Sequence, residues 1–522
     1  MQRRLSACLL AAALLVAGPM ALVRAAVPND SSALRDAVTV DGMLEHLEAL
    51  DAIGAANGNT RVDDTPGFEE SVDYVADRLT DAGYDVEIQP FTFDAFISED
   101  TELERISPDP RVYVEGFLND FGVSEFSASG DVTEAITPVD VVVPIGANPP
   151  STSNSGCEAA DFGGFPVGNI ALIQRGTCPF ADKAVNAEAA GAAGVLLFNE
   201  GQPDIPGDDR VGVINATLGE PGLVTIPVFD TTYAIGAELV ELTRLPNAEP
   251  VILHMQTTAE FKTFESTNVI AETSGGRADR TVLLGAHLDS VAEGPGINDN
   301  GSGVATVLEI AEEIAELDLQ PRNKVRFAFW GGEEFGLLGA EHYVATASPR
   351  DLKNIAVNLN FDMVGSPNYV RFVYDGDGSA TGAKGPSGSG NVEKVFDEYF
   401  ASQGLATEPT AFDGRSDYGP FIAVGIPAGG LFTGAEGIKT ADEAETYGGD
   451  AGVAYDVCYH SACDTLDNVN LTVLDQMADA AAHATWSFAQ TTSAINGTSK
   501  ASAKTLEAGL DALLWRGNHR QR

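Results

Sequence analysis

Six side chains that can bind metal ions lie at predicted strand ends or in loops of this sequence. Histidine nitrogens and carboxylate oxygens suit zinc and leave coordination positions open for water and substrate. In an open α/β sheet, residues that follow the carboxyl ends of strands gather at one edge, where ligands bind. We therefore expect one shared site from His287, Asp299, Glu333, Glu334, Asp362 and His460.

The expected chemistry needs two metal ions that share a ligand. A carboxylate that bridges two ions holds them about 3.5–4 Å apart, where together they activate water and polarise a carbonyl group. Glu333 and Glu334 are neighbours, and an acid beside a ligand can act as the general base. Taken alone, a histidine after a strand more often forms a structural hydrogen bond, and a Glu-Glu pair is usually solvated. Their joint placement after successive apolar strands favours the metal site.

The elements that must position these residues alternate between helix and strand, which is typical of an α/β fold. Apolar residues at helical spacing, together with start and stop signals, predict helices. Apolar or alternating runs predict strands, and a Gly/Ser-rich segment at 376–390 predicts a loop. The predicted helices are 43–50, 66–82, 302–317 and 477–488, and the predicted strands are 84–88, 268–272, 281–286, 324–330 and 355–361.

The segment between about 130 and 260 has a different texture, with short strand-like runs and an alanine-rich helix at 183–193. It predicts a separate domain inserted into the first one. The predicted strands of this domain are 141–144, 170–173, 195–198 and 225–229. The full predicted division is 1–25 signal peptide, 26–130 first part of the α/β domain, 131–260 insert, 261–490 second part and 491–522 tail.

Residues 1–25 have the features of a secretory signal peptide. Two arginines precede an apolar run at 5–23, and a small-residue cleavage site ends at Ala25. An uncleaved membrane anchor is the alternative, because a run of this length just spans a bilayer. The break at Gly18-Pro19 favours cleavage. We expect a secreted protein, extracellular or periplasmic, with no stable membrane insertion after cleavage.

The charge balance excludes one large class of partners. The chain has 77 acidic and 30 basic residues, which gives a net charge of −47. A surface this negative repels phosphate backbones and anionic lipid, so nucleic acid is not an expected partner. The composition does not indicate an oligomeric state.

Four cysteines remain once Cys8 leaves with the signal peptide. They form two local pairs in a chain expected in an oxidising compartment, which predicts two disulfides. A four-cysteine zinc site is the competing interpretation, but the spacings do not match paired C-x₂-C knuckles. The predicted disulfides are Cys157–Cys178 and Cys458–Cys463.

Six short segments resemble, in order, the motifs of the secreted di-zinc aminopeptidases, of the bacterial leucine aminopeptidase and aminopeptidase Y type. A further segment, 168–199, resembles the protease-associated (PA) domain. The resemblance covers most of residues 40–490. It implies a mixed central sheet flanked by helices, a mainly-β PA insert, and release of N-terminal residues from peptides. The six segments are 287–290, 298–303, 329–337, 360–366, 414–417 and 458–464.

The same resemblance implies how two zinc ions are held in each chain. His287, Asp299 and Asp362 would bind one ion, and Asp299, Glu334 and His460 would bind the other. Asp299 would thus be the bridging carboxylate, and a cis peptide bond is expected directly after it.

The remaining roles also come from the resemblance. Glu333 would take a proton from the water nucleophile and pass it to the leaving amine. Tyr459 would steady the tetrahedral oxyanion. Asp289 and Asp464 would orient the two histidine ligands.

Substrate selection is expected at four positions. Gly414 and Arg415 match family positions near the free amino end of the substrate. Met363 and Phe432 match positions that line an apolar side-chain pocket, where a large apolar first residue such as leucine would gain roughly 1.5–3 kcal/mol by burial. Plain core packing is the alternative for these two residues.

Calcium is a further expectation. Asp475 and Asp479 match calcium-binding positions of some relatives. The N-terminal half of that site is not recognisable in this chain.

Other activities on the same scaffold stay open at this point. A zinc carboxypeptidase or an aminoacylase-like amidohydrolase would use the same ligands, although the contexts of Arg415 and Tyr459 favour an aminopeptidase. A metal-free receptor would have lost ligands, yet all of them are present here.

Overall fold

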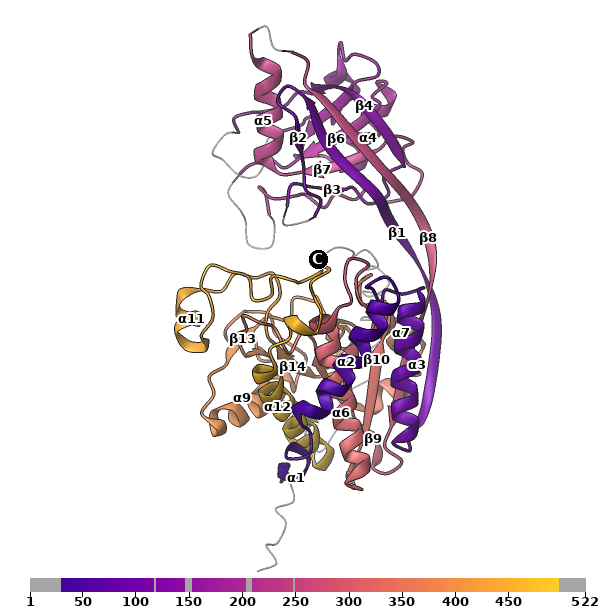
Figure 1. Cartoon of the computed structure of the whole chain (residues 1–522), viewed down its shortest axis with the longest axis vertical. Helices are drawn as coiled ribbons and strands as arrows, with labels where there is room; N and C mark the ends of the chain where they lie inside the picture. Colours follow the sequence, from indigo (N-terminus) through magenta and orange to yellow (C-terminus); the bar gives the residue numbers. More distant parts are fainter. Residues whose placement is uncertain (1–29, 117–118, 146–152, 203–208, 247–248, 497–522) are drawn as a thin grey trace, which may run out of the picture.

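The computed structural model describes residues 30–116, 119–145, 153–202, 209–246 and 249–496. Two domains lie one above the other in Figure 1. The lower one, called here the α/β domain, holds strands β9 to β14. The upper one holds β3 to β7. The predicted signal peptide at 1–25 and the end of the predicted tail, 497–522, lie outside the described residues.

The sheet of the α/β domain is mixed, as predicted. Its centre is four parallel strands in the order β14-β11-β9-β10, and β8 and β12 run antiparallel at their flanks. The carboxyl ends of the parallel strands therefore meet at one edge. The bounds are β8 Ile252–Glu272, β9 Arg277–His287, β10 Asn323–Trp330, β11 Ile355–Phe361, β12 Phe372–Tyr374, β13 Glu408–Thr410 and β14 Ala428–Phe432.

Helices cover both faces of this sheet, because successive side chains of a buried strand point to opposite sides. Leu284 of β9 belongs to the larger core cluster, with Leu308 of α6, whereas its neighbour Leu283 packs with Val344 of α7 on the other face. The first layer is α2 Val40–Ala56, α3 Pro66–Asp81, α6 Ser302–Glu316, α9 Ser389–Gln403 and α12 Leu471–Gln490, and the second is α7 Leu338–Thr346, α8 Pro349–Asn354 and α10 Tyr418–Ala423.

Short helices complete the α/β domain. They lie at its termini and between its strands, and some follow clear capping signals. Thr440, for example, forms a capping box with Glu443 at the start of α11. The bounds are α1 Ser32–Arg35, α11 Ala441–Tyr447, α13 Ser493–Asn496, η2 Ile297–Gly301 and η3 Leu466–Asn468.

The strands of the upper domain continue the sheet of the α/β domain, because β4 pairs antiparallel with β8. Strands β4, β5, β6 and β7 are parallel neighbours, and β3 joins β7 in the antiparallel sense. Apolar side chains from both faces of this sheet form two further core clusters. The bounds are β2 Arg111–Val112, β3 Phe121–Val123, β4 Gly130–Pro138, β5 Ile170–Gln174, β6 Gly194–Phe198, β7 Val228–Thr231, η1 Ala159–Phe162, α4 Phe180–Ala189 and α5 Tyr233–Arg244.

One pair of long strands runs through both domains. β1, Asp85–Ser107, pairs antiparallel with β8 from Asp85↔Glu272 to Ser107↔Ile252. Figure 1 shows this two-stranded ribbon rising from the α/β domain into the upper domain. The domains are thus joined by a shared β ladder, which has register shifts between Glu99 and Glu102 and between Arg105 and Ser107. The predicted boundaries at 130 and 260 stay a prediction.

Most predicted elements appear where the sequence places them, and two in the upper domain do not. The prediction of a strand at 141–144 is wrong, because the buried Gln174 side chain binds both the N–H and the carbonyl of Val142 in place of a neighbouring strand. The strand predicted at 225–229 begins only at Val228, since Pro227 has no backbone N–H to donate to a neighbouring strand.

Among the described residues, no helix is both long and apolar enough to cross a membrane.

Candidate metal centre

The ends of three neighbouring strands bring the predicted ligands together. His287 is the last residue of β9 and lies in register with Trp330, the last residue of the parallel strand β10. Asp362 directly follows β11. Asp299 lies in the η2 turn between β9 and α6, and the peptide bond after it is cis, as predicted.

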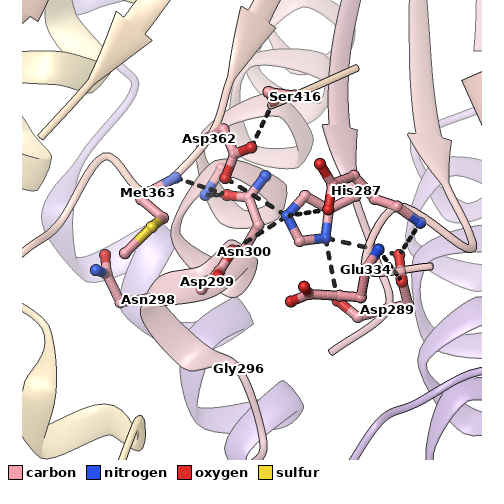
Figure 2. Close-up of polar contacts among 12 residues, drawn as sticks. His287, Asp289, Gly296, Asn298, Asp299, Asn300, Glu334, Asp362, Met363 and Ser416 are labelled. Carbon is pink, nitrogen blue, oxygen red and sulfur yellow. Dashed lines mark hydrogen bonds and ion pairs between the residues drawn. The ribbon is translucent and has the colours of Figure 1, made fainter. Parts of the chain in front are cut away.

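Asp299 faces both histidines of the cluster, and Figure 2 shows its contact with His287. Its Oδ1 lies 3.1 Å from Nε2 of His287, and its Oδ2 lies 3.4 Å from Nε2 of His460. Asp362 Oδ1 is 3.4 Å from the same His287 nitrogen, and Glu334 Oε2 is 3.0 Å from the His460 nitrogen. With Glu333 Oε2 at 4.0 Å, the His287 nitrogen faces three carboxylates, the His460 nitrogen faces two, and Asp299 is shared by both.

Burial and mutual repulsion raise the pKa values of Glu333 and Glu334 in this cluster. Burial, with the neighbouring Asp299, raises the pKa of Glu334 to about 7 although His460 lowers it. Burial also raises the pKa of Glu333 well above its usual value, and Asp417 and Asp362 act in the same direction while His287 opposes them. Because buried charges must be paired or bind a metal, a site of this composition fits cations.

The donor set fits metal ions in its chemistry as well. Glu334 Oε1 is buried and has no hydrogen-bond partner. Within this cluster, two groups of ligand atoms lie close enough to hold a metal ion, and Glu333 belongs to one of them. Two imidazoles with several carboxylates are the ligands of zinc sites that keep open positions. The groups are His287, Glu333, Asp362 and His287, Asp299, Glu334.

Asp289 positions residues of this cluster through hydrogen bonds with their backbone and ring nitrogens. Its carboxylate accepts hydrogen bonds from the backbone N–H groups of Glu333, at 3.2 Å, and Glu334, at 3.0 Å. Its backbone carbonyl lies 3.2 Å from Nδ1 of His287. Asp289 thus fixes the turn that carries both glutamates as well as the orientation of the histidine ring.

Asp464 acts on a different partner from the one predicted. We expected it to orient His460, but its carboxylate accepts the backbone N–H groups of Asn298, at 2.8 Å, and Asp299, at 3.0 Å. The side chain of Asn468 donates to it as well. Asp464 therefore holds the η2 turn and, through it, the shared carboxylate.

Two further supporting residues were not among the predicted site residues. Arg61 is fully buried and donates to the carbonyls of Pro295 and Gly296, which precede the η2 turn. Ser416 Oγ donates to Asp362 Oδ2 at 2.5 Å. Arg61 lies far from every recognised motif, whereas Ser416 lies inside the 414–417 segment and could have been found from its position there.

A pocket opens beside the cluster. Met363, Phe432, Arg415 and Tyr459 line it together with the carboxylates, whereas Gly414 is not among its lining residues. The ring of Tyr459 stacks on that of His460 with 3.9 Å between the ring centres. The remaining lining residues are Asp299, Glu333, Glu334, Asp362, Tyr374, Thr410, Ala411, Asp413, Ser416 and Ala435.

Both predicted disulfides are present. Cys458–Cys463 encloses Tyr459 and His460, and Cys157–Cys178 lies in the upper domain. The calcium prediction stays a prediction, because Asp475 and Asp479 fall in none of the groups of three close ligand atoms among the described residues.

Comparisons with known proteins agree with this geometry. Residues 268–485 match the model of peptidase family M28, and residues 139–239 match the PA domain. An aminopeptidase of Pseudomonas aeruginosa is 48% identical over 444 residues, which cover 85% of this chain and 80% of the relative. A probable lipoprotein aminopeptidase of Mycobacterium tuberculosis is 39% identical, with 89% of this chain and 88% of the relative covered.

Solved structures give the same assignment. The aminopeptidase from Aneurinibacillus sp. strain AM-1 has a TM-score of 0.61 at 26% identity, covering 87% of this chain and 95% of that one. A zinc aminopeptidase from Bacillus subtilis has a TM-score of 0.56 at 25% identity, with 85% and 94% covered. The chain therefore belongs to peptidase family M28, is an aminopeptidase and carries a PA domain.

Proposed function

We propose that this aminopeptidase is secreted, holds two zinc ions and releases large apolar N-terminal residues such as leucine from peptides. The observation that carries the proposal is the position of Asp299, which offers one carboxylate oxygen to His287 and the other to His460. His287 and Asp362 would complete one zinc site around Asp299. His460 and Glu334 would complete the other.

The bound zinc ions would supply Lewis-acid chemistry, which polarises the scissile carbonyl and makes water a better nucleophile. The protein side chains transfer the proton and stabilise the oxyanion. Glu333, buried at the pocket wall, accepts a proton from the attacking water and hands it to the leaving amine. Tyr459 donates its phenolic O–H to the developing oxyanion.

The pocket itself favours a free amino terminus. Acidic side chains from the cluster and Asp413 line it, and Arg415 is the one basic side chain among its lining residues in the described part of the chain. Zinc ions would neutralise the ligand carboxylates, so Glu333 and Asp413 are the lining acids that remain to attract a substrate ammonium group, which favours an aminopeptidase over a carboxypeptidase. Met363 and Phe432 offer apolar surface to the first side chain.

Zinc and secretion have independent support. The neighbour from Bacillus subtilis is named a zinc aminopeptidase, and the Mycobacterium tuberculosis relative is named a probable lipoprotein. Two disulfides suit a protein that functions outside the reducing cytosol.

One experiment tests the proposal. The purified protein should hold close to two zinc ions per chain by elemental analysis, hydrolyse Leu-p-nitroanilide, and leave N-acetyl-Leu-p-nitroanilide intact. Exhaustive chelation should abolish hydrolysis, and added zinc should restore it. Full activity in protein proven free of metal would refute the mechanism. Hydrolysis of the N-blocked substrate would point instead to the amidohydrolase alternative.

A further inference from the structure

Arg415 forms a bridge between a glutamate outside the pocket lining and the tyrosine beside the metal centre. Its Nη1 donates to Glu436 Oε1 at 2.7 Å, and its Nη2 donates to the hydroxyl oxygen of Tyr459 at 3.3 Å. The side chains of Arg415 and Glu436 are 30% and 24% exposed. One nitrogen of the guanidinium group is thus held by a carboxylate while another faces the phenol.

The segment that carries Glu436 is joined to the segment that leads to Tyr459. The backbone N–H of Asp456 donates to the carbonyl of Ala435 at 2.9 Å, and that of Tyr455 donates to Gly437 at 2.9 Å. These bonds lie directly on either side of Glu436. Because the guanidinium group is planar and its N–H groups keep fixed angles, an anchor at Nη1 also sets the direction of Nη2.

The direction of this bond matters for the chemistry proposed for Tyr459. A phenol that accepts an N–H has one lone pair occupied and its own hydrogen free to donate elsewhere. Without its anchor, the Arg415 guanidinium would be drawn toward the carboxylates that share the pocket with it, such as Glu333 and Asp413. The Tyr459 hydroxyl would then lose the partner that orients it.

We propose that Glu436 is a positioning residue of this aminopeptidase, which holds Arg415 so that the Tyr459 hydroxyl points its hydrogen at the substrate oxyanion. The inference rests on the proposed oxyanion role of Tyr459. It assigns a function in the reaction to a glutamate that touches neither the metal centre nor the substrate pocket.

A double-mutant cycle on the full-length, zinc-loaded protein tests the proposal. Tyr459→Phe should lower kcat about 100-fold, the loss typical of one oxyanion donor. Glu436→Gln should lower kcat roughly 10-fold and leave the KM for Leu-p-nitroanilide within about two-fold, because misplacement of a catalytic group costs rate more than ground-state binding. In the Tyr459→Phe background, Glu436→Gln should change kcat less than about two-fold.

Three controls separate positioning from a structural effect. Zinc content and thermal midpoint should stay unchanged in Glu436→Gln. Glu436→Asp, which keeps the charge, should recover part of the lost kcat. Glu241→Gln breaks a Glu-Arg pair of similar length, 3.0 Å, in the upper domain and should leave kcat unchanged.

Arg415→Lys provides a second variant with the same expectation, because lysine cannot bridge both partners at fixed angles. Its kcat loss should not add to that of Glu436→Gln. Equal losses for Glu436→Gln in both Tyr459 backgrounds, after a large loss from Tyr459→Phe, would overturn the inference and leave the proposed function intact. A normal kcat in Tyr459→Phe would overturn the oxyanion role, and the inference would fall with it.

Discussion

The carboxylate of Asp289 accepts a hydrogen bond from the backbone N–H of Glu334 at 3.0 Å, although the two residues lie 45 positions apart. Asp289, which lies two residues after the end of β9, thereby holds the turn that follows β10. The same residue faces the His287 ring with its backbone carbonyl. The geometry of the candidate metal centre is thus set partly by a side chain that binds no metal in the proposed arrangement.

Asp289→Asn should weaken zinc binding. The amide keeps the shape of the carboxylate, but its NH₂ group faces a backbone N–H where the native oxygen accepted one. Loss of a supporting hydrogen bond around metal ligands typically costs 10–100-fold in metal affinity. Zinc titration of the apoprotein should show a loss of this order, and an affinity equal to that of the native protein would contradict the role given to Asp289.

Glu333→Gln and Glu334→Gln should have different effects, although the residues are neighbours. Glu333→Gln removes the proposed base, so kcat should fall by about 10²–10⁴-fold while both zinc ions stay bound. Glu334→Gln should lower zinc occupancy, because a neutral amide is a poorer ligand than a carboxylate. Zinc content and kcat of both variants check this. Zinc loss in Glu333→Gln with full occupancy in Glu334→Gln would exchange the two roles.

Removal of the Cys458–Cys463 disulfide should loosen one zinc site. His460 has φ 53°, in the left-handed region that costs a non-glycine residue free energy. The disulfide closes a short loop around it, so the double serine variant should allow the backbone to relax and should lower zinc occupancy and kcat. The matched variant without Cys157–Cys178, in the upper domain, should keep both zinc ions. Equal effects of the two variants would argue against a specific role.

Asp230 should make the upper domain less stable as pH rises. This aspartate is buried, and burial raises its pKa to about 7 although hydrogen bonds from Ser124 and Ala216 lower it. The folded state therefore keeps a proton that the unfolded state loses above pH 3.8, its ordinary value. The stability from this group is fully present below that pH and falls by about 1.4 kcal/mol per pH unit until about pH 7.

Asp230→Asn removes this dependence and can keep both hydrogen bonds. The thermal midpoint of the variant, relative to that of the native protein, should therefore rise between pH 4.5 and pH 7.5. A difference that is the same at both pH values would show that Asp230 does not titrate in this range.

The sequence indicated several candidate ligands because they follow strands whose apolar pattern is strong, whereas Asp299 and His460 lie in loops. His287, Glu334 and Asp362 lie near the ends of parallel strands, where local pattern and topology agree. The cis bond after Asp299 was implied by the resemblance to the aminopeptidase motifs, and both disulfides were predicted from the local pairs of cysteines. These features depend on short segments of chain.

The features that the sequence did not predict depend on contacts between distant residues. The alternating pattern predicted a strand only at 84–88, whereas β1 continues to Ser107 because β8 supplies a pairing partner. Asp464 binds backbone groups of the η2 turn, a partner that no spacing in the sequence indicates. Arg61 reaches carbonyls more than 200 positions away, and only the folded chain reveals why an arginine is buried there.

The β1–β8 ladder limits where this chain can be shortened. Deletion of residues 131–260 would remove the partners of Ile97 to Ser107. This part of β1 would then expose unpaired backbone N–H and C=O groups, as an edge strand does, and would promote aggregation. A trimmed enzyme should instead be cut at one rung of the ladder, by connecting Ile97 to its partner Glu260 through a tight turn. The excisable module is therefore defined by strand register, and it begins and ends within two strands that both domains share.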